Sequence, residues 1–424
     1  MSVVSLSSKK KKRTSSMDDK WLLSRCTSKS SEEIVVNDDD LLSLILLRIS
    51  YRKLKCFKCV SKRWLYLITA PQFVGLRCSL LPLRAPIALF CQPCPNHVYF
   101  LPLDYPHNPS PFRTLDFAND PFDPQRIRIL ASCNGLLLCS TCLLALPHHI
   151  TTYVYNPSSN QLAVLPKYPP PVANRVLYRS LAFDPKNSPH YKVIAFITTS
   201  LSDYTGDFHV YSSQTGTWTL SLHSFFLPKH MYLSYGVYWR SCLHWLGDLN
   251  FMSYGLYFNL DAGTLSTFPG PPINGKLTSK SSYFGESEGH LHFIGGCLTA
   301  TSVTVYEMKT DYSHWFIKYS IDLAPISKVF PEMTKHKTCY VDGNSYVFAA
   351  LSLIRREIFQ EDSFLVLEIP GKVIRYNLVD TSFKAIWDFA VDFGVEKVDI
   401  WRFGTFRVWQ YIEVWQYIEA LLWL

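Results

Sequence analysis

A weak internal repeat of about 48 residues constrains the fold of this 424-residue chain more than any other feature. Leu243–Trp245 recurs 48 residues later as Leu291–Phe293, and Tyr257–Asn259 recurs at the same distance as Val305–Glu307. A repeat of ~40–50 residues with several strands in each period is typical of the blades of a β-propeller. At this period, about 300 residues predict about six blades.

From about residue 126 onward, the chain has the pattern of an antiparallel β domain. Short runs of aromatic and β-branched residues alternate with turn sequences such as Asn156–Asn160, Asp184–Asn187 and Asp261–Gly263. Pro in such turns fixes φ and removes a backbone donor, while Gly supplies positive φ. With 48% hydrophobic residues the chain can bury a large core, which excludes a wholly disordered protein.

Residues 34–75 instead predict three short helices. Asn37–Asp40 offers N-caps for the first helix, Ser50 can cap the second, and Pro71 begins the third. The apolar positions recur at helical spacing, in the first helix at Leu41, Leu42, Ile45 and Leu46, and in the second at Leu54, Phe57, Val60, Trp64 and Ile68. A core built from ~40 residues is marginal alone, so we expect this module to need a partner.

The expected fold class is therefore α+β, a small three-helix module followed by a mainly antiparallel β-propeller. The predicted boundaries are a disordered basic tail at 1–33, the helices at 34–75, a Pro-rich linker with initial strands at 76–125, and the β domain at 126–424. No run approaches the ~18 apolar residues of a membrane span, so no membrane partner is expected.

The net charge of +8 is concentrated at the start of the chain. Residues 1–30 hold eight basic and two acidic residues, so six of the eight net charges lie there. A nucleic-acid-binding domain carries its basic excess on the folded part, so no nucleic-acid partner is expected. The run Lys9–Arg13 suits either a nuclear import signal or a solvated tail. The N-terminus has no apolar signal core, and we expect a nuclear or cytoplasmic protein with free thiols.

Nothing in the sequence predicts catalysis, a metal or a cofactor. The stretch Gly285–Gly289 matches Gly-x-Ser-x-Gly but leads into no predicted helix, so it lacks the context of a catalytic serine. His244 and His292 occupy equivalent repeat positions, which favours an inner-strand residue hydrogen-bonded within each blade over a metal or catalytic role. Three Cys-x-x-Cys pairs occur, and two of them lie too far apart for the usual zinc spacing: Cys56/Cys59, Cys91/Cys94 and Cys139/Cys142.

The C-terminus carries a tandem copy of six residues. Val408–Glu413 is followed at once by the identical Val414–Glu419. The apolar residues of this repeat suit a helix or a closing strand equally well.

The helical segment resembles an F-box. Asp40–Ile49, Phe57–Trp64 and Leu67–Phe73 carry the resemblance, and the stretch Cys59–Trp64 (CVSKRW) is its most specific part. Three positions differ from the family pattern. The usual Leu-Pro before the first helix is Val36-Asn37, the usual Glu is Leu44, and the usual Pro after the first helix is Ser50.

The β region resembles the kelch-like, F-box-associated domain of plant F-box proteins. The stretches that match are Ser132–Leu137, Tyr155–Ser159, Leu181–Pro185, His190–Ile194, Tyr211–Trp218, Gly236–Trp239, His244–Trp245, Tyr306–Met308 and Ile374–Leu378. With the F-box, the resemblance covers nearly all of residues 35–390.

The resemblance implies a non-catalytic substrate-recognition subunit of an SCF-type ubiquitin ligase. In such a subunit the F-box docks a Skp-type adaptor and through it a cullin-RING scaffold, while the β domain captures a protein substrate. The residues expected to bind the adaptor are Leu41, Leu42, Ile45, Leu46, Leu54, Phe57, Val60, Ser61, Trp64 and Ile68. No motif identifies the residues that bind substrate. The alternative is a protein-binding propeller whose F-box does not join a ligase.

Overall fold

The structure, a computed structural model, describes residues 37–49, 51–80, 86, 88–94, 97–103, 119–120, 123–124, 126–142, 150–157, 159, 161–168, 176–200, 204–273, 282–296, 301–338, 341–356, 362–388 and 413–417. The chain divides into two compact units, residues 1–74 and 75–424. The basic tail predicted at 1–33 lies outside the described residues. Among the described residues, no helix is both long and apolar enough to cross a membrane.

The helical segment contains four helices rather than the predicted three: α3 (Asp39–Leu47), α4 (Tyr51–Phe57), α5 (Lys62–Thr69) and α6 (Pro71–Leu80). The predicted second helix is divided because Ser61 adopts an extended backbone and caps α5, its hydroxyl accepting a hydrogen bond from the Trp64 N–H at 3.1 Å. Asp38 caps α3, as the sequence predicts, by accepting from the N–H groups of Asp40 and Leu41. The helix α6 crosses the boundary between the two units.

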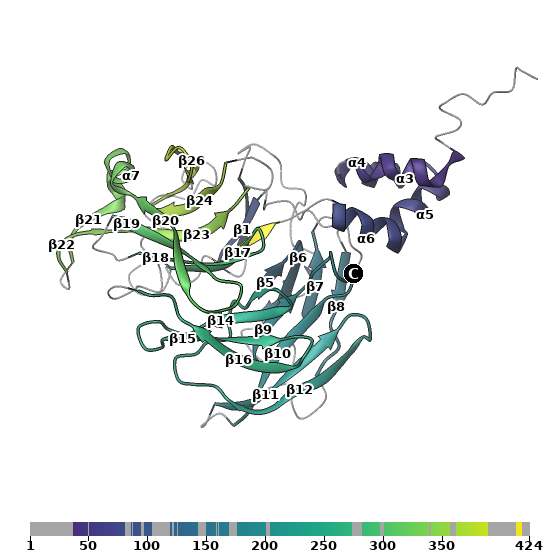
Figure 1. Cartoon of the computed structure of the whole chain (residues 1–424), viewed down its shortest axis with the longest axis horizontal. Helices are drawn as coiled ribbons and strands as arrows, with labels where there is room; N and C mark the ends of the chain where they lie inside the picture. Colours follow the sequence, from purple (N-terminus) through teal and green to yellow (C-terminus); the bar gives the residue numbers. More distant parts are fainter. Residues whose placement is uncertain are drawn as a thin grey trace, which may run out of the picture. The chain divides into compact units, whose positions relative to one another are not determined.

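The second unit is a mainly antiparallel β-propeller with five four-stranded sheets (Figure 1). In each sheet the strands lie in sequence order. The sheets are β5 (Arg126–Cys133), β6 (Leu136–Cys142), β7 (Thr152–Asn156) and β8 (Gln161–Val164); β9 (Val176–Ala182), β10 (Lys192–Ser200), β11 (Thr205–Ser212) and β12 (Thr217–Phe226); β13 (Val237–Trp239), β14 (Cys242–Leu246), β15 (Tyr254–Asn259) and β16 (Thr264–Pro269); β17 (Tyr283–Ser287), β18 (His290–Gly296), β19 (Ser302–Met308) and β20 (Trp315–Asp322); and β23 (Ala349–Ile354), β24 (Phe364–Ile369), β25 (Lys372–Asn377) and β26 (Phe383–Asp388).

The predicted count of about six blades is corrected to five four-stranded ones. A further sheet has only three strands, in the order β2 (His97–Pro102), β1 (Ala88–Cys94) and β27 (Glu413–Tyr417). It joins an early hairpin of the unit to a strand from the end of the chain. The smaller elements are β3 (Asn119–Asp120), β4 (Asp123–Pro124), α7 (Ala324–Val329), a 3-10 turn (Pro331–Met333), β21 (Thr334–Thr338) and β22 (Val341–Tyr346).

The sheets follow one another around a closed ring. The first strands of neighbouring sheets lie side by side, with β5 next to β9, β13 next to β17, and β17 next to β23. The sheet of β9 also meets the next sheet through β14, and β27 lies between β23 and β5. The C-terminal strand therefore closes the ring.

Aromatic side chains fill the space between successive sheets. Between the second and third sheets, Phe208 stacks on Phe258 with ring centroids 5.3 Å apart, and Trp245 lies 6.3 Å from Phe208. All three are fully buried. Such rings bury large apolar areas and prefer offset or tilted contacts. The repeated aromatic positions of the sequence are thus the interior of the propeller.

A tryptophan hydrogen bond ties three of the four-stranded sheets to a neighbouring sheet. The indole N–H of Trp218 donates to the Pro166 carbonyl at 2.9 Å, and that of Trp315 donates to the Pro269 carbonyl at 2.7 Å. Trp387 donates to the carbonyl of Pro102 in the three-stranded sheet, at 3.4 Å. Proline has no backbone N–H donor, but its carbonyl oxygen still accepts a hydrogen bond. Trp218 and Trp315 thus bond to the preceding sheet, whereas Trp387 bonds to the three-stranded sheet that follows its own sheet in the ring.

Candidate functional site

The ten predicted adaptor-binding residues divide between the interior and the surface of the helical unit. Four of them are buried, each no more than 3% exposed: Leu42, Leu46, Leu54 and Ile68. They lie in the interior and do not share one surface with the exposed members of the set, because the 3.6-residue period marks the core side of a small helical module as readily as a binding side. These four residues form the core that holds the helices together. The adaptor-binding role of the ten residues stays a prediction.

The other six predicted residues lie at or near the surface. Leu41, Ile45 and Val60 are exposed, and Ser61 is exposed as the cap of α5. Phe57 and Trp64 are partly buried against each other, edge to face, with ring centroids 5.4 Å apart. This edge-to-face pair joins α4 to α5 across the turn that the sequence analysis placed inside one helix.

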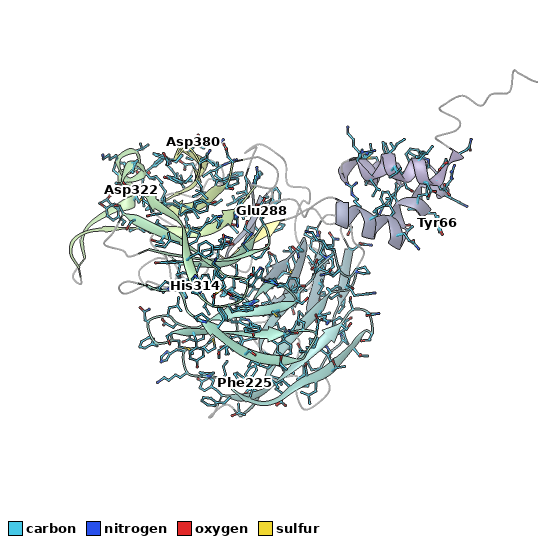
Figure 2. All side chains as sticks on the ribbon, in the orientation of Figure 1. Tyr66, Phe225, Glu288, His314, Asp322 and Asp380 are labelled. Carbon is cyan, nitrogen blue, oxygen red and sulfur yellow. The ribbon has the colours of Figure 1, made fainter. Side chains whose placement is uncertain are left out.

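Three exposed apolar residues of the helical unit were not predicted: Leu44, Leu65 and Tyr66. Leu44 lies three residues after Leu41 and next to Ile45, so the three side chains share one side of α3, called here the α3 face. Tyr66 is 73% exposed on α5 (Figure 2). The signal was present in the sequence, since an apolar residue where the F-box family has Glu widens the apolar stripe of α3.

The α3 face is held in place by a charged contact at the start of its helix. The Arg63 guanidinium of α5 donates from Nε to Asp39 Oδ1 at 2.7 Å, and its Nη2 lies 2.6 Å from the same oxygen. Both side chains are substantially exposed, so this pair orients the two helices rather than adding much stability. It fixes α3 relative to α5 and thereby the direction of the α3 face.

In the propeller, exposed aromatic residues gather on the second and third four-stranded sheets. The aromatic surface, as we name it, consists of Tyr204, Phe226, Tyr232, Tyr235 and Phe251, each at least 49% exposed. Tyr204 lies between β10 and β11, Phe226 ends β12, Tyr232 and Tyr235 lie between β12 and β13, and Phe251 lies between β14 and β15. Because strands alternate in direction, the connections that follow second and fourth strands leave the same end of each sheet.

Backbone contacts bring these connections together. The Leu227 N–H donates to the Tyr204 carbonyl at 2.9 Å, which places Tyr204 beside Phe226. The Asp248 N–H donates to the His230 carbonyl at 2.8 Å, and the His230 ring stacks on Phe251 with centroids 4.3 Å apart. The surface is therefore formed by three connections that bond to one another.

The aromatic surface rests on buried anchors and carries unusual backbone. Leu227, Met231 and Leu233 are buried in the core between the two sheets, so alternate residues of the segment point inward. Tyr204 and Tyr235 have positive φ angles of 50° and 59°. Non-glycine residues adopt this conformation rarely, and they cluster at functional sites. In the sequence, Met231 and Leu233 alternating with Tyr232 after Pro228 is the signal that could have identified this surface.

The equivalent histidines lie on second strands, not on the innermost strands. Burial lowers the pKa of His244 to about 4, so its ring is neutral at physiological pH. Its Nδ1–H faces the Val237 carbonyl at 3.2 Å, which leaves Nε2 to accept from the Tyr312 hydroxyl at 2.8 Å. Val237 is in the same sheet and Tyr312 in the next. His244 thus bonds across a sheet boundary, which is a structural role.

His292 belongs to an ionic cluster around the buried carboxylate of Glu307. Glu307 oxygens lie 2.8 Å from His290 Nδ1, 3.4 Å from His292 Nε2, 3.2 Å from Arg355 Nη1 and 3.8 Å from Lys318 Nζ. Burial alone would raise the pKa of Glu307, but the neighbouring basic groups hold it below its usual value. Arg355 follows β23, so this cluster connects the fourth four-stranded sheet to the fifth.

The Gly285–Gly289 stretch has the strand–turn–strand structure that the sequence predicts. Ser287 ends β17 and is buried, and its hydroxyl accepts from the Arg355 N–H at 2.9 Å. Glu288 and Gly289 make the tight turn into β18 with positive φ. Among the described residues, no group of three or more His, Cys, Asp or Glu side chains is arranged to hold a metal. Cys56 and Cys59 are exposed, while Cys91 and Cys139 are buried.

The chain is similar to F-box proteins that carry a β-propeller. The profile of the "F-box protein At3g26010-like, beta-propeller" family matches residues 109–340. The F-box protein At5g07610 of Arabidopsis thaliana is 33% identical over 366 residues, which cover 78% of this chain and 81% of that protein. A second Arabidopsis thaliana F-box protein, At3g16210, is 29% identical over 236 residues, covering 55% of this chain and 61% of that protein.

A solved structure described as TolB from Agrobacterium tumefaciens aligns with a TM-score of 0.33 and 9% identity, covering 72% of this chain and 89% of that one. A similarity this low says nothing of function. The family match covers more than half of the chain, and the first relative is aligned over most of both proteins. The chain therefore belongs to the family of F-box proteins that carry an At3g26010-like β-propeller.

Proposed function

We propose that this chain is a substrate-recognition subunit of an SCF-type ubiquitin ligase. Its helical unit docks a Skp-type adaptor, which links it to the cullin-RING scaffold, and its propeller binds a protein substrate. The α3 face carries this proposal, because three neighbouring apolar side chains on one exposed helix side are what a helix-in-groove interface requires. The contribution to ubiquitination is proximity, since the substrate is held near a ubiquitin-carrying enzyme.

The adaptor interface is tested by co-purification of the full chain with a Skp-type adaptor. Ile45→Asp places a charge on the α3 face and should abolish co-purification. Lys53→Asp is the control, because Lys53 is exposed on the neighbouring helix α4 and outside the α3 face, and it should leave the adaptor bound. A chain beginning at residue 76 should not bind at all.

The competing function is a protein-binding propeller that does not join a ligase. Leu44 favours it, because this exposed residue stands where the F-box family has Glu. Ser50 likewise replaces the usual Pro. If the unaltered chain fails to co-purify with the adaptor, this second function holds and the ligase assignment is lost.

For the capture of substrate we propose the aromatic surface. Tyr and Phe rings supply much contact area at little cost in side-chain entropy, which is why aromatic residues dominate protein interfaces. The test compares proteins that co-purify with the full chain and with Tyr232→Ala/Phe251→Ala. Ile317→Ala is the control, because Ile317 is equally exposed but lies on β20. The same proteins lost from both variants would contradict a role for this surface.

A further inference from the structure

Two exposed cysteines lie three residues apart at the end of helix α4, which is labelled in Figure 1. Cys56 belongs to the last turn of α4, and Cys59 lies in the connection to α5. The other cysteines whose burial the structure describes are all buried: Cys91, Cys133, Cys139 and Cys242. Cys56 and Cys59 are therefore the pair that reagents in solution can reach, and the proposed function gives them no role.

The backbone brings the two cysteine side chains to the same side of the chain. The Lys58 N–H donates to the Leu54 carbonyl at 3.0 Å, as in an α-helix, but the Cys59 N–H donates to the Cys56 carbonyl at 3.1 Å. The end of α4 thus tightens into a 3-10 turn, in which side chains three residues apart eclipse each other. At ~2.0 Å rise per residue, the Cα atoms of such a pair lie ~6 Å apart, within the range of ~4.4–6.8 Å that a disulfide spans.

Closing a disulfide between these cysteines requires a small local movement. Cβ atoms one helical turn apart are separated by ~5–6 Å, whereas a disulfide requires ~3.5–4.5 Å. Cys59 lies in a connection and not in a helix, so the chain can yield at this residue. A link that needs such a movement is easily reduced again. Disulfides of this kind in reducing compartments are redox-sensing and not structural.

Basic residues surround the pair. Lys53 is exposed one turn before Cys56, and Lys58 lies between the two cysteines. Residues 48–63 contain seven basic residues and no acidic one. Glutathione disulfide is an anion at neutral pH, because its carboxylates outnumber its ammonium groups. A basic surface attracts such a reagent and raises its local concentration.

We propose that Cys56 and Cys59 form a reversible disulfide, which closes by thiol–disulfide exchange with glutathione disulfide. The thiolate of one cysteine attacks a sulfur of glutathione disulfide, whose S–S bond breaks and releases one glutathione, which takes up the proton. The thiolate of the other cysteine then attacks the protein sulfur of this mixed disulfide and releases the second glutathione in the same way. The two protein thiols lose two electrons, and these reduce one glutathione disulfide to two thiols.

The disulfide lies next to residues that the proposed function assigns to the adaptor interface. Val60 follows Cys59 directly, and Phe57 lies between the two cysteines. Because movement of Cys59 displaces Val60, the disulfide form should bind a Skp-type adaptor about 10-fold more weakly than the reduced form. This effect rests on the proposed function, whereas formation of the disulfide does not.

Mass spectrometry of the full chain tests the disulfide. The folded chain is incubated with glutathione disulfide, the remaining thiols are alkylated, and the protein is digested with trypsin. Trypsin cleaves after Lys55, Lys58 and Lys62, so the peptides 56–58 and 59–62 stay joined only through a disulfide. The joined peptides should be the main product, and dithiothreitol should separate them.

Cys56→Ser and Cys59→Ser are the matched controls. Each variant should yield only a mixed disulfide of glutathione with the remaining cysteine. In urea, the ratio of joined peptides to mixed disulfides should fall by about 10-fold, because the turn no longer holds the two thiols together. The buried Cys91 and Cys139 should be alkylated only in urea, which verifies that the chain stays folded in the main experiment.

The proposal is overturned if the unaltered chain carries mixed disulfides in place of the joined peptides, or if neither thiol reacts. An unchanged ratio in urea would also overturn it, since the fold would then contribute nothing to the link. A link that joins two chains, seen in non-reducing electrophoresis, would do the same.

Co-purification of the reduced and the oxidised chain with a Skp-type adaptor is measured separately. Joined peptides together with no adaptor bound to the reduced chain would support the disulfide and contradict the proposed function. Equal binding of the adaptor by both forms would support the disulfide and contradict only its effect on the interface.

Discussion

The two units of this protein differ in how completely they bury their apolar residues. Six large apolar residues are exposed between residues 37 and 74, against twelve over the rest of the described chain, which is several times longer. Of those twelve, five form the aromatic surface. An exposed apolar area that is large relative to the size of the unit is typical of a protein-binding surface. In the propeller, the aromatic surface is the place where such residues gather.

The interiors differ as well. Between residues 37 and 74, no charged side chain whose burial the structure describes is buried. The propeller encloses Glu307, Arg355 and His292 in one cluster. A larger core can enclose polar groups because their neighbours satisfy them, whereas a single layer of short helices has no room for such partners. The interior of the helical unit therefore depends on apolar packing, and its Arg63–Asp39 ion pair lies at the surface.

The largest expected effect is the loss of a core aromatic residue. Phe258→Ala removes a fully buried ring that stacks on Phe208, and it should destabilise the propeller by about 3–5 kcal/mol. Leu54→Ala in the helical unit should cost about 2–5 kcal/mol, enough to unfold a unit of this size. Urea unfolding, followed by limited proteolysis, distinguishes unfolding of the helical unit from unfolding of the propeller. If Leu54→Ala also lowered the midpoint of the propeller, the two units would not be independent.

The second prediction sharpens the contrast at the surface of the helical unit. Val60→Ala combined with Trp64→Ala removes an exposed side chain and half of the edge-to-face pair with Phe57. Binding to a Skp-type adaptor should weaken by about 100-fold, or ~2.7 kcal/mol, because aromatic anchors dominate such interfaces. The propeller should melt at an unchanged temperature. Lys62→Ala is the control, since Lys62 is exposed and polar on the same helix. Calorimetric titration gives the affinities.

The sequence predicted the propeller well because its repeat records a physical requirement. Trp218 and Trp315 recur where outer strands begin, and the structure gives both the same bond to a proline carbonyl of the preceding sheet. The turn at Asn259–Gly263 could also be predicted from the sequence. The Asn259 side chain accepts hydrogen bonds from the backbone N–H groups of Asp261 and Ala262, and Gly263 has a positive φ of 66°. A turn of this kind depends on only a few adjacent residues, so the sequence alone predicts it.

The sequence predicted the surfaces poorly because periodicity does not tell the inside of a module from its outside. Leu42 and Ile45 fit the same helical pattern, yet one is buried and the other exposed. The aromatic surface needed three connections that are distant in sequence, and only the fold brings Tyr204, Tyr232 and Phe251 together. The count of six blades failed for another reason: the sixth sheet has only three strands, and two of them, β1 and β2, precede residue 126, where the predicted β domain begins.

A third prediction concerns the charges inside the propeller. Burial raises the pKa of Glu368 to about 7. The folded state then holds more protons than the unfolded state between about pH 4.5 and 7, so stability falls as the pH rises through this window. Glu368→Gln should remove the loss, making the variant more stable than the unaltered protein at pH 8 by about 1–3 kcal/mol and equal to it near pH 4.5. Urea unfolding at both pH values measures this.

The matched control is Glu332→Gln, because Glu332 is exposed in the 3-10 turn of the same unit. It should change stability by less than about 0.5 kcal/mol at either pH. Equal stabilisation by the two variants at pH 8 would mean that net charge, not burial, is the cause. Buried charge would then no longer distinguish the stability of the propeller from that of the helical unit.

The smallest expected effect concerns the bonds between sheets. Trp315→Phe keeps an aromatic ring but removes the N–H that donates to the Pro269 carbonyl at 2.7 Å. One hydrogen bond of this kind contributes about 0.5–1.5 kcal/mol, so the variant should lose that amount and unfold in a single transition. Trp218→Phe should behave alike, because its indole makes the equivalent bond between the two sheets before. If the two losses differed by more than about 1 kcal/mol, the bonds would not be equivalent parts of one repeat, and the propeller's stability would be distributed unevenly among its sheets.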